Sequence, residues 1–209
     1  MRAGTKGVPR ADRETQILDA ADRLFGAGGY ASTSVDAVAR EAGISKPLVY
    51  QYFGAKDGLF AACLSRATHT LVDAIEDVAR GESVGLERGV LTLAAIFATL
   101  EPHPYTWRLI FDGSAPADGP TRRARQEYQD RIVDLARDGV GEMLTLAGVS
   151  DPLDRDAMTV VWLRVVDALV DWWLEHPEQS ADDMVRRSVR LITAVAASPA
   201  SAPPPPSAI

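Results

Sequence analysis

The feature that most constrains the fold of this chain is the spacing of its apolar residues, which recur every three or four positions from Asp12 onward. The first segment shows the pattern with Ile17, Ala20, Ala21, Leu24 and Phe25. Such spacing gathers apolar side chains on one face of an α-helix. Glycine, proline and serine stand between these segments, and no stretch alternates as a strand would. The sequence therefore predicts an all-α fold.

Helix-starting and helix-ending residues divide the chain into separate helices. Gly26, Gly28 and Gly29 are expected to end the first helix, which starts near Asp12. The segments Thr33–Asp36 and Ser180–Asp183 have the form of capping boxes. Prolines stand at most of the later junctions. After the first helix we expect helices over residues 35–42, Lys46–Phe53, Lys56–Arg80, Glu87–Leu100, Tyr105–Phe111, Thr121–Ala147, Leu153–Glu175 and Ala181–Ala197.

Two short helices joined by Ala42–Gly43–Ile44 have the dimensions of a helix-turn-helix. The first would pack across the second through Val35, Val38, Ala39 and Ile44. The second would turn Val49 and Phe53 to the core and expose Lys46, Leu48, Gln51 and Tyr52. Tyr50 can donate its hydroxyl to a phosphate. Lys56, beside the amides that open the next helix, is suited to clamp another phosphate. The pattern predicts a DNA-reading surface.

A long ordered string of positions within residues 12–60 resembles the amino-terminal domain of the TetR (tetracycline-repressor) family of transcriptional regulators. The string comprises Ile17–Phe25, Gly29–Tyr30, Thr33–Val35, Val38–Ala39, Ala42–Ser45, Val49–Tyr50, Tyr52–Phe53, Lys56 and Leu59–Phe60. The resemblance implies an amino-terminal three-helix DNA-binding domain and a carboxy-terminal helical domain for ligand binding and dimerisation. The expected function is that of a homodimeric, ligand-responsive repressor bound to double-stranded palindromic operator DNA.

Carried over position by position, the resemblance implies a set of DNA-binding residues. The groove-facing residues are Lys46, Pro47, Leu48 and Tyr52, and the phosphate-binding residues are Thr33, Ser34, Ser45, Tyr50 and Lys56. Gln51 either contacts a base or is solvated. The basic residues Arg2, Lys6, Arg10 and Arg13 either form a minor-groove arm or stay unengaged.

The resemblance also implies that the long helices enclose a pocket for a small apolar or amphipathic effector. The residues suited to line it, each of which could instead belong to the core, are Phe97, Trp107, Ile110, Phe111, Tyr128, Met143, Met158 and Trp162. The last two long helices carry apolar stripes that can pair with a twofold mate. The candidate dimer residues, which could also be intrachain core, are Val166, Leu169, Trp173, Val185, Val189 and Ile192.

Charge and composition suggest how the chain is divided. Residues 1–56 hold 8 basic and 6 acidic side chains, whereas 57–209 hold 14 and 23, so the two parts are expected to meet different partners. We expect four segments: a flexible basic arm (1–11), the helix-turn-helix domain (12–56), the regulatory and dimerisation domain (57–197), and a disordered Pro/Ala/Ser tail (198–209).

Composition also excludes several classes of protein. The single cysteine, Cys63, can form no intrachain disulfide and no cysteine cage for a metal. No apolar run approaches the roughly 20 residues of a membrane span, and the opening residues lack the apolar core of a signal peptide. We therefore expect a cytoplasmic protein that needs no cofactor, no metal and no membrane, and that is not an enzyme.

Two alternative functions remain open. A ligand-independent DNA-binding regulator would be favoured if the helical domain had no cavity of a few hundred Å³. A helical metal-dependent enzyme is the more distant alternative, since Asp167, Asp171, Glu175 and His176 have helical spacing that could gather carboxylates around a divalent ion. A solvated acidic face explains these four residues better.

Overall fold

The computed structural model describes residues 9–196, and within that range every regular element is an α-helix. The predicted all-α fold is confirmed. The helices in chain order are α1 (Arg10–Ser32), α2 (Val35–Glu41), α3 (Lys46–Phe53), α4 (Lys56–Ala79), α5 (Gly85–Leu100), α6 (Tyr105–Ile110), α7 (Gly119–Leu146), α8 (Pro152–Leu174) and α9 (Ala181–Ala196). The whole of the expected tail, and Arg2 and Lys6 of the expected arm, lie outside the described residues.

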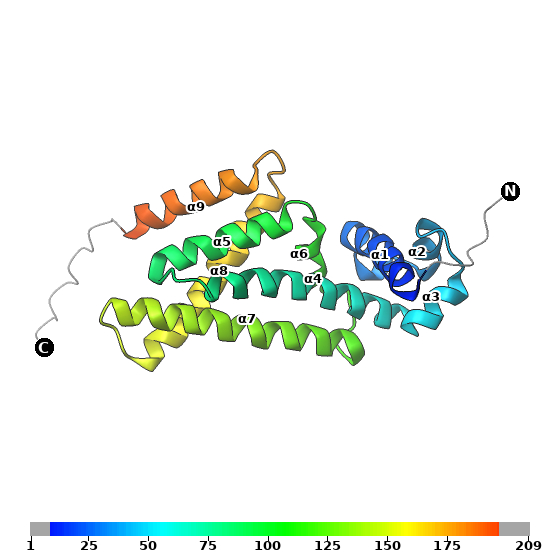
Figure 1. The fold of residues 1–209 in the computed structure, drawn as a ribbon, viewed down its shortest axis with the longest axis horizontal. Helices are drawn as coiled ribbons and strands as arrows, with labels where there is room; N and C mark the ends of the chain where they lie inside the picture. The colour runs from blue at the N-terminus through cyan, green and yellow to red at the C-terminus, as the bar shows by residue number, and fades with distance from the viewer. Residues whose placement is uncertain (1–8, 197–209) are drawn as a thin grey trace, which may run out of the picture.

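The molecule is elongated, with α1–α3 grouped at one end and α5–α9 forming the larger remainder (Figure 1). Helix α4 runs from the first group into the second. Its amino half belongs to the core of the small group, where Leu59 and Phe60 pack with Ile17, Phe25 and Val38. Its carboxyl half belongs to the core of the larger group. One rigid helix is therefore shared by both cores.

Of the three glycines expected to end the first helix, Gly29 does interrupt the helical geometry, with φ 75° and ψ 170°, whereas the helix continues through Gly26 and Gly28. Gly26 is a packing residue. A Cβ there would lie 2.3 Å from the Cβ of Tyr105, so only glycine lets α6 approach α1 this closely. A glycine in a helix interior costs about 1 kcal/mol relative to alanine. The contact with α6 compensates for that cost.

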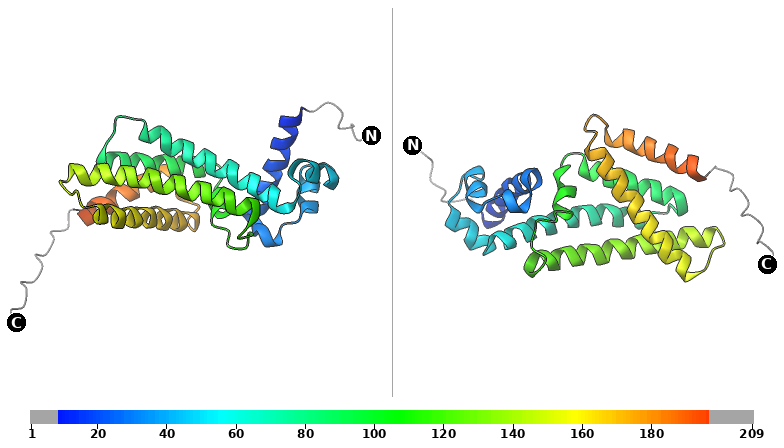
Figure 2. Two further views of the ribbon diagram at one scale, coloured as in Figure 1. Left: turned by 90° about the horizontal axis from the view of Figure 1, so that it is seen from below. Right: turned by 180° about the vertical axis from the view of Figure 1, so that it is seen from behind.

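The larger group has its own core between α4, α5, α7, α8 and α9. Helix α7 lies along α4, α9 lies along α5, and α8 crosses the group obliquely (Figure 2). The ring of Trp173 stands edge-on to Phe97 with centroids 5.2 Å apart, which joins α8 to α5. Helices α8 and α9 each leave one side uncovered by the rest of the described chain.

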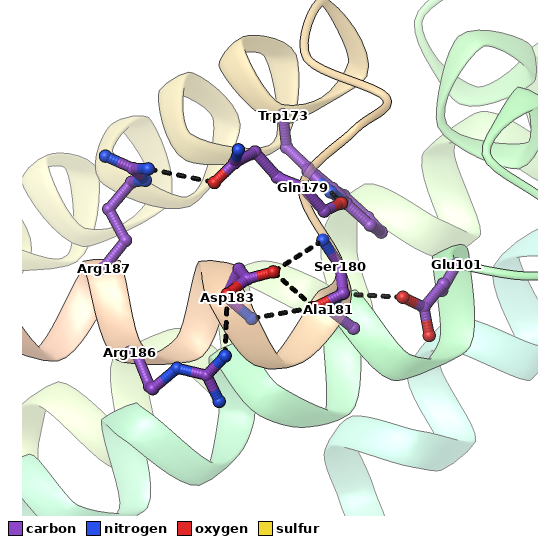
Figure 3. A network of polar contacts seen from close by, with 8 residues as sticks. All are labelled: Glu101, Trp173, Gln179, Ser180, Ala181, Asp183, Arg186 and Arg187. Carbon is purple, nitrogen blue, oxygen red and sulfur yellow. Dashed lines mark hydrogen bonds and ion pairs between the residues drawn. The ribbon is translucent and has the colours of Figure 1, made fainter.

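The junction between α8 and α9 confirms the predicted capping box at Ser180–Asp183 (Figure 3). The Asp183 N–H donates to the Ser180 hydroxyl at 3.2 Å, and the Asp183 carboxylate accepts from the Ser180 N–H at 3.2 Å. Hydrogen bonds from Ser180 and the ion pair with Arg186 lower the pKa of Asp183 to about 2. The Ala181 N–H donates to Glu101 at 2.7 Å, which attaches the start of α9 to the end of α5. The same view includes Trp173, Gln179 and Arg187, which bond across the connection.

Candidate DNA-binding surface and effector cavity

Helices α2 and α3 are joined by a tight turn that holds α3 across α2. Gly43 adopts φ 64° in this turn, a conformation that favours glycine. The Ile44 N–H donates to the Ala39 carbonyl at 2.9 Å. Val49 turns inward and is buried, so the opposite side of α3 faces outward. The turn therefore presents one face of a short helix to solvent, which is the geometry of a groove-reading helix.

The expected groove-facing residues lie on or beside this outward face. Lys46 and Pro47 are exposed, whereas Leu48 and Tyr52 are half-buried. The Arg10 guanidinium stands 5.2 Å from the centre of the Tyr52 ring, which ties the start of α1 to α3. Arg13, the other described residue of the expected arm, is buried and donates to Gln16 at 2.7 Å.

Lys46 forms an ion pair with Asp36 of α2, with 2.9 Å between the Lys46 Nζ and a carboxylate oxygen. The hydrogen bond to Asp36 and the charge of that carboxylate raise the pKa of Lys46. Asp36 was expected to reach back toward its own helix terminus, but the N-cap of α2 is Ser34, which accepts from the Ala37 N–H at 3.1 Å. The ammonium best placed to meet a base is thus paired with a carboxylate when no DNA is present.

The expected phosphate-binding residues divide into two groups. Ser34, Ser45 and Tyr50 are exposed, with Tyr50 41% accessible. Thr33 is buried, and its hydroxyl donates to the carbonyls of Leu24 and Gly29 in α1. Lys56 is half-buried, with its Nζ 4.2 Å from the centre of the Tyr30 ring. Thr33 is therefore placed as a cap of α1, since its side chain points away from the surface formed by the other residues.

A cavity of about 320 Å³ lies between α4, α5, α7 and α8, with one residue of α6 at its wall. Five of the eight expected effector-binding residues line it, namely Trp107, Tyr128, Met143, Met158 and Trp162. The other three lie outside the lining. Phe97 and Ile110 are buried in the core, and Phe111 is 52% exposed with its ring 4.7 Å from that of Trp107.

Residues of α4 and α5 that the sequence reasoning did not select also form the cavity wall. They are Leu71, Ile75, Gly89 and Ile96, among others. A Cβ on Gly89 would lie 3.3 Å from the Trp162 indole, so the absence of a side chain at Gly89 leaves room for the indole. The only sequence signal for Leu71, Ile75 and Ile96 is helical spacing, which they share with the fully packed core.

The two candidate sites are joined by polar contacts as well as by α4. Just after α6, Asp112 accepts from the Tyr30 N–H at 2.5 Å, and Ser114 accepts from the Ala31 N–H at 3.1 Å. Burial opposes ionisation of Asp112, but the hydrogen bonds from Ser114 and Tyr30 outweigh it and lower the pKa of this carboxyl. Asp57 at the start of α4 accepts from the Thr121 hydroxyl of α7. The two ends of the connection between α6 and α7 are thus hydrogen-bonded to the end of α1 and to the start of α4.

The expected dimer residues lie at different depths. Val166 and Trp173 are buried within the chain, Leu169, Val185 and Ile192 are half-buried, and Val189 is 38% exposed. Six further apolar residues of α8 and α9 are also exposed. These are Leu153, Val160, Val161, Trp172, Leu191 and Val195. We call these six residues and Val189 the outer apolar face.

The residues considered for a metal centre have other partners. Asp171 accepts from the Trp107 indole N–H at 3.0 Å, and the His176 ring stacks on Trp172 with centroids 3.8 Å apart. Within residues 9–196, no group of three or more His, Cys, Asp or Glu side chains is arranged to hold a metal ion. None of the described helices is long and apolar enough to cross a membrane.

Comparisons with known proteins place the chain among regulators. Residues 17–63 match the family described as bacterial regulatory proteins, tetR family. The HTH-type transcriptional activator FasR of Mycolicibacterium smegmatis is 34% identical over 132 residues, which are 61% of this chain and 60% of FasR. The chain thus aligns with less than two thirds of that relative's length.

Solved structures extend the likeness to the helical domain. A TetR-like transcriptional regulator from Rhodococcus sp. RHA1 is 26% identical, with a TM-score of 0.72 over 92% of this chain and 100% of that one. FadR from Bacillus subtilis, solved in complex with stearoyl-CoA, is 17% identical, with a TM-score of 0.71 over 88% of this chain and 97% of FadR. The likeness to FadR concerns the fold alone.

Proposed function

We propose, from the premise that this chain belongs to the TetR family of bacterial transcriptional regulators, that it is a homodimeric DNA-binding repressor released from its operator by a small ligand. The proposal that the protein binds DNA rests on the outward face of α3. Val49 anchors that helix in the core, while Lys46 and Tyr50 stand exposed at its amino end and along its side. These side chains can donate hydrogen bonds to base edges and phosphates.

The operator we propose is a palindrome read by a twofold dimer. The outer apolar face on α8 and α9 supports a second copy as the partner, since exposed apolar side chains of one surface tend to mark an interaction site. Two identical reading helices then meet two half-sites about one helical turn apart. The protein would act on this DNA in the cytoplasm.

The cavity of about 320 Å³ supports a ligand-responsive repressor over a ligand-independent one, because a regulator without an effector has no need of such a space. Trp107 lines the cavity, and Asp112, five residues later, bonds to the end of α1. A ligand that displaces α6 or α4 would therefore move α1–α3 and change the separation of the two reading helices. The expected coupling is about 1–3 kcal/mol, or roughly 5–150-fold in DNA affinity.

The test is selection of DNA by the full-length protein from a random double-stranded library. We expect enrichment of a palindrome, because phosphate contacts alone carry no sequence information and base contacts must supply it. Lys46→Ala should change the enriched sequence. Tyr50→Phe should leave the sequence unchanged and weaken binding to all DNA.

The same variants provide the control and the contradicting result. Both must unfold at the temperature of the unsubstituted protein for a change in DNA binding to be assigned to contacts. If no sequence were enriched at moderate salt, the chain would not be a sequence-specific regulator. If Lys46→Ala and Tyr50→Phe behaved alike, the placement of α3 in the groove would be incorrect.

A further inference from the structure

The effector cavity has three aromatic side chains in its wall. Trp107 from α6, Tyr128 from α7 and Trp162 from α8 line this space together with aliphatic side chains. Aromatic faces attract both apolar groups and cations, because the ring quadrupole is negative at its face. The walls alone therefore admit a neutral or a cationic ligand.

The cavity lining has little positive charge to offer an anion. Arg88 is the only basic residue among the described residues of the lining. One of its terminal nitrogens is 2.6 Å from a carboxylate oxygen of Glu142, and its Nε donates to the Ser83 carbonyl at 2.7 Å. A ligand carboxylate or phosphate would have to compete with Glu142 for this guanidinium. The other charged residues of the lining are Asp138 and Asp167.

Negative charge concentrates on α8, close to the aromatic wall. Asp167 lines the cavity, and Asp171, one helical turn further, accepts the Trp107 indole N–H at 3.0 Å. The cation nearest Asp167 is Arg164 at 3.2 Å, whose side chain is 79% exposed, so water screens its charge. Burial and the neighbouring Asp171 raise the pKa of Asp167. This carboxylate therefore lacks a buried counter-charge.

Tyr128 adds an unpartnered polar group to the same wall. Its side chain is more than nine-tenths buried, it lines the cavity, and no group among the described residues forms a hydrogen bond with its hydroxyl. Burial, followed by the charge of Asp167, raises the pKa of this phenol, so it remains uncharged. The hydroxyl oxygen keeps some accessible surface, so it can form a hydrogen bond with a group inside the cavity. A bound ligand would provide such a group.

We infer that the effector is an apolar molecule with one cationic group, an amine or a quaternary ammonium, whose charge lies beside Asp167 and Tyr128 on the cavity wall. This inference rests on the proposal that the cavity holds the effector. The aliphatic side chains of α4 and α5 cover the apolar part of the ligand. The cationic group supplies a counter-charge from inside the cavity to Asp167, whose present partner Arg164 is exposed to solvent, and it can contact the face of the Tyr128 ring.

The experiment titrates the full-length protein with three probes that share one alkyl chain and differ in charge: octyltrimethylammonium, 1-octanol and octanoate, all below their micellar concentrations. Binding is followed by tryptophan fluorescence and by calorimetry. We expect octyltrimethylammonium to bind about tenfold or more tightly than octanoate, with octanol between them, the scale of a cation–π contact combined with a partly screened ion pair.

Three variants test the assignment to particular residues. Asp167→Asn should weaken octyltrimethylammonium about tenfold and leave octanol unchanged, because only the charge is removed. Asp154→Asn removes the same charge from the exposed first turn of α8, outside the lining, and should change neither. Glu142→Gln frees Arg88 and should strengthen octanoate. Thermal unfolding of each variant checks that the fold is kept.

The inference is overturned if octanoate binds as tightly as octyltrimethylammonium, if Asp167→Asn leaves their order unchanged, or if none of the probes binds. Each of these outcomes is separate from failure of the proposed function. The DNA selection described above uses the protein without ligand. A protein that enriches a palindrome and prefers octanoate would be a regulator with an anionic effector.

Discussion

At the scale of the residue, Lys46 is paired with Asp36, and under the proposed function this pair would limit how readily α3 engages DNA. The Lys46 ammonium must leave the Asp36 carboxylate before it can meet a base edge, and the carboxylate then faces a phosphate-rich surface. We predict that Asp36→Asn strengthens DNA binding. The gain should be roughly two- to fivefold, since exposed ion pairs contribute about 0.2–1 kcal/mol. Fluorescence anisotropy of a labelled operator at two salt concentrations measures it.

A matched control separates this local effect from a change in net charge. Asp130→Asn on α7, outside α1–α3, removes the same charge from an exposed side chain that bonds to Gln126. It should leave DNA affinity within about twofold because salt screens distant surface charges. Weaker DNA binding by Asp36→Asn would mean that the carboxylate positions Lys46 for contact instead of competing for it.

At the scale of the element, the approach of α6 to α1 depends on Gly26. An added Cβ would lie 2.3 Å from the Tyr105 Cβ, so one of the two helices must shift. We predict that Gly26→Ala destabilises the protein by about 1–3 kcal/mol, since overpacking outweighs the gain in helix propensity. Urea unfolding followed by circular dichroism gives the free energy of unfolding.

Gly139 in α7 is the comparison for Gly26. A Cβ there meets no atom within 4 Å, so Gly139→Ala should stabilise the protein by about 0.5–1 kcal/mol through helix propensity alone. If the two substitutions change the free energy of unfolding in opposite directions, Gly26 is required for helix packing and Gly139 is not. Equal stabilisation by both would show that α6 can move away from α1 without cost.

At the scale of the whole molecule, the proposed dimer would form through the outer apolar face and hold the two α3 helices together. Val161 on α8 and Leu191 on α9 are both 52% exposed. We predict that Val161→Asp combined with Leu191→Asp yields a monomer, because a dimer interface would have to bury two unpaired carboxylates. Analytical ultracentrifugation at micromolar concentration measures the mass. Operator affinity should fall with it, since each copy then holds only one half-site.

The control for the dimer prediction introduces the same charge on an exposed apolar residue elsewhere. Val84 precedes α5, is 45% exposed, and does not belong to the outer apolar face. Val84→Asp should leave the mass and the operator affinity unchanged. A double variant that still sedimented as a dimer would place the interface on another surface.

The sequence by itself determined the helices, the helix-turn-helix and the resemblance to the TetR family, because each depends on local patterns. Helical spacing predicted the inward face of α3 at Val49. Side chains that bond to nearby backbone predicted the cap at Ser180–Asp183. These signals operate within a few residues, where the chain geometry alone decides which groups can meet.

Only the tertiary structure decided which apolar residues surround a space and which polar groups meet across helices. The sequence pattern does not distinguish Tyr128 from Phe97, since both are expected either to line the pocket or to belong to the core. In the structure Tyr128 lines the cavity, whereas Phe97 packs on Trp173. Gly26 reads as a helix end, but the approach of Tyr105 keeps it inside α1. The physical reason is that periodicity marks the face a helix buries, whereas packing depends on the neighbour, distant in sequence, that covers or fails to cover that face.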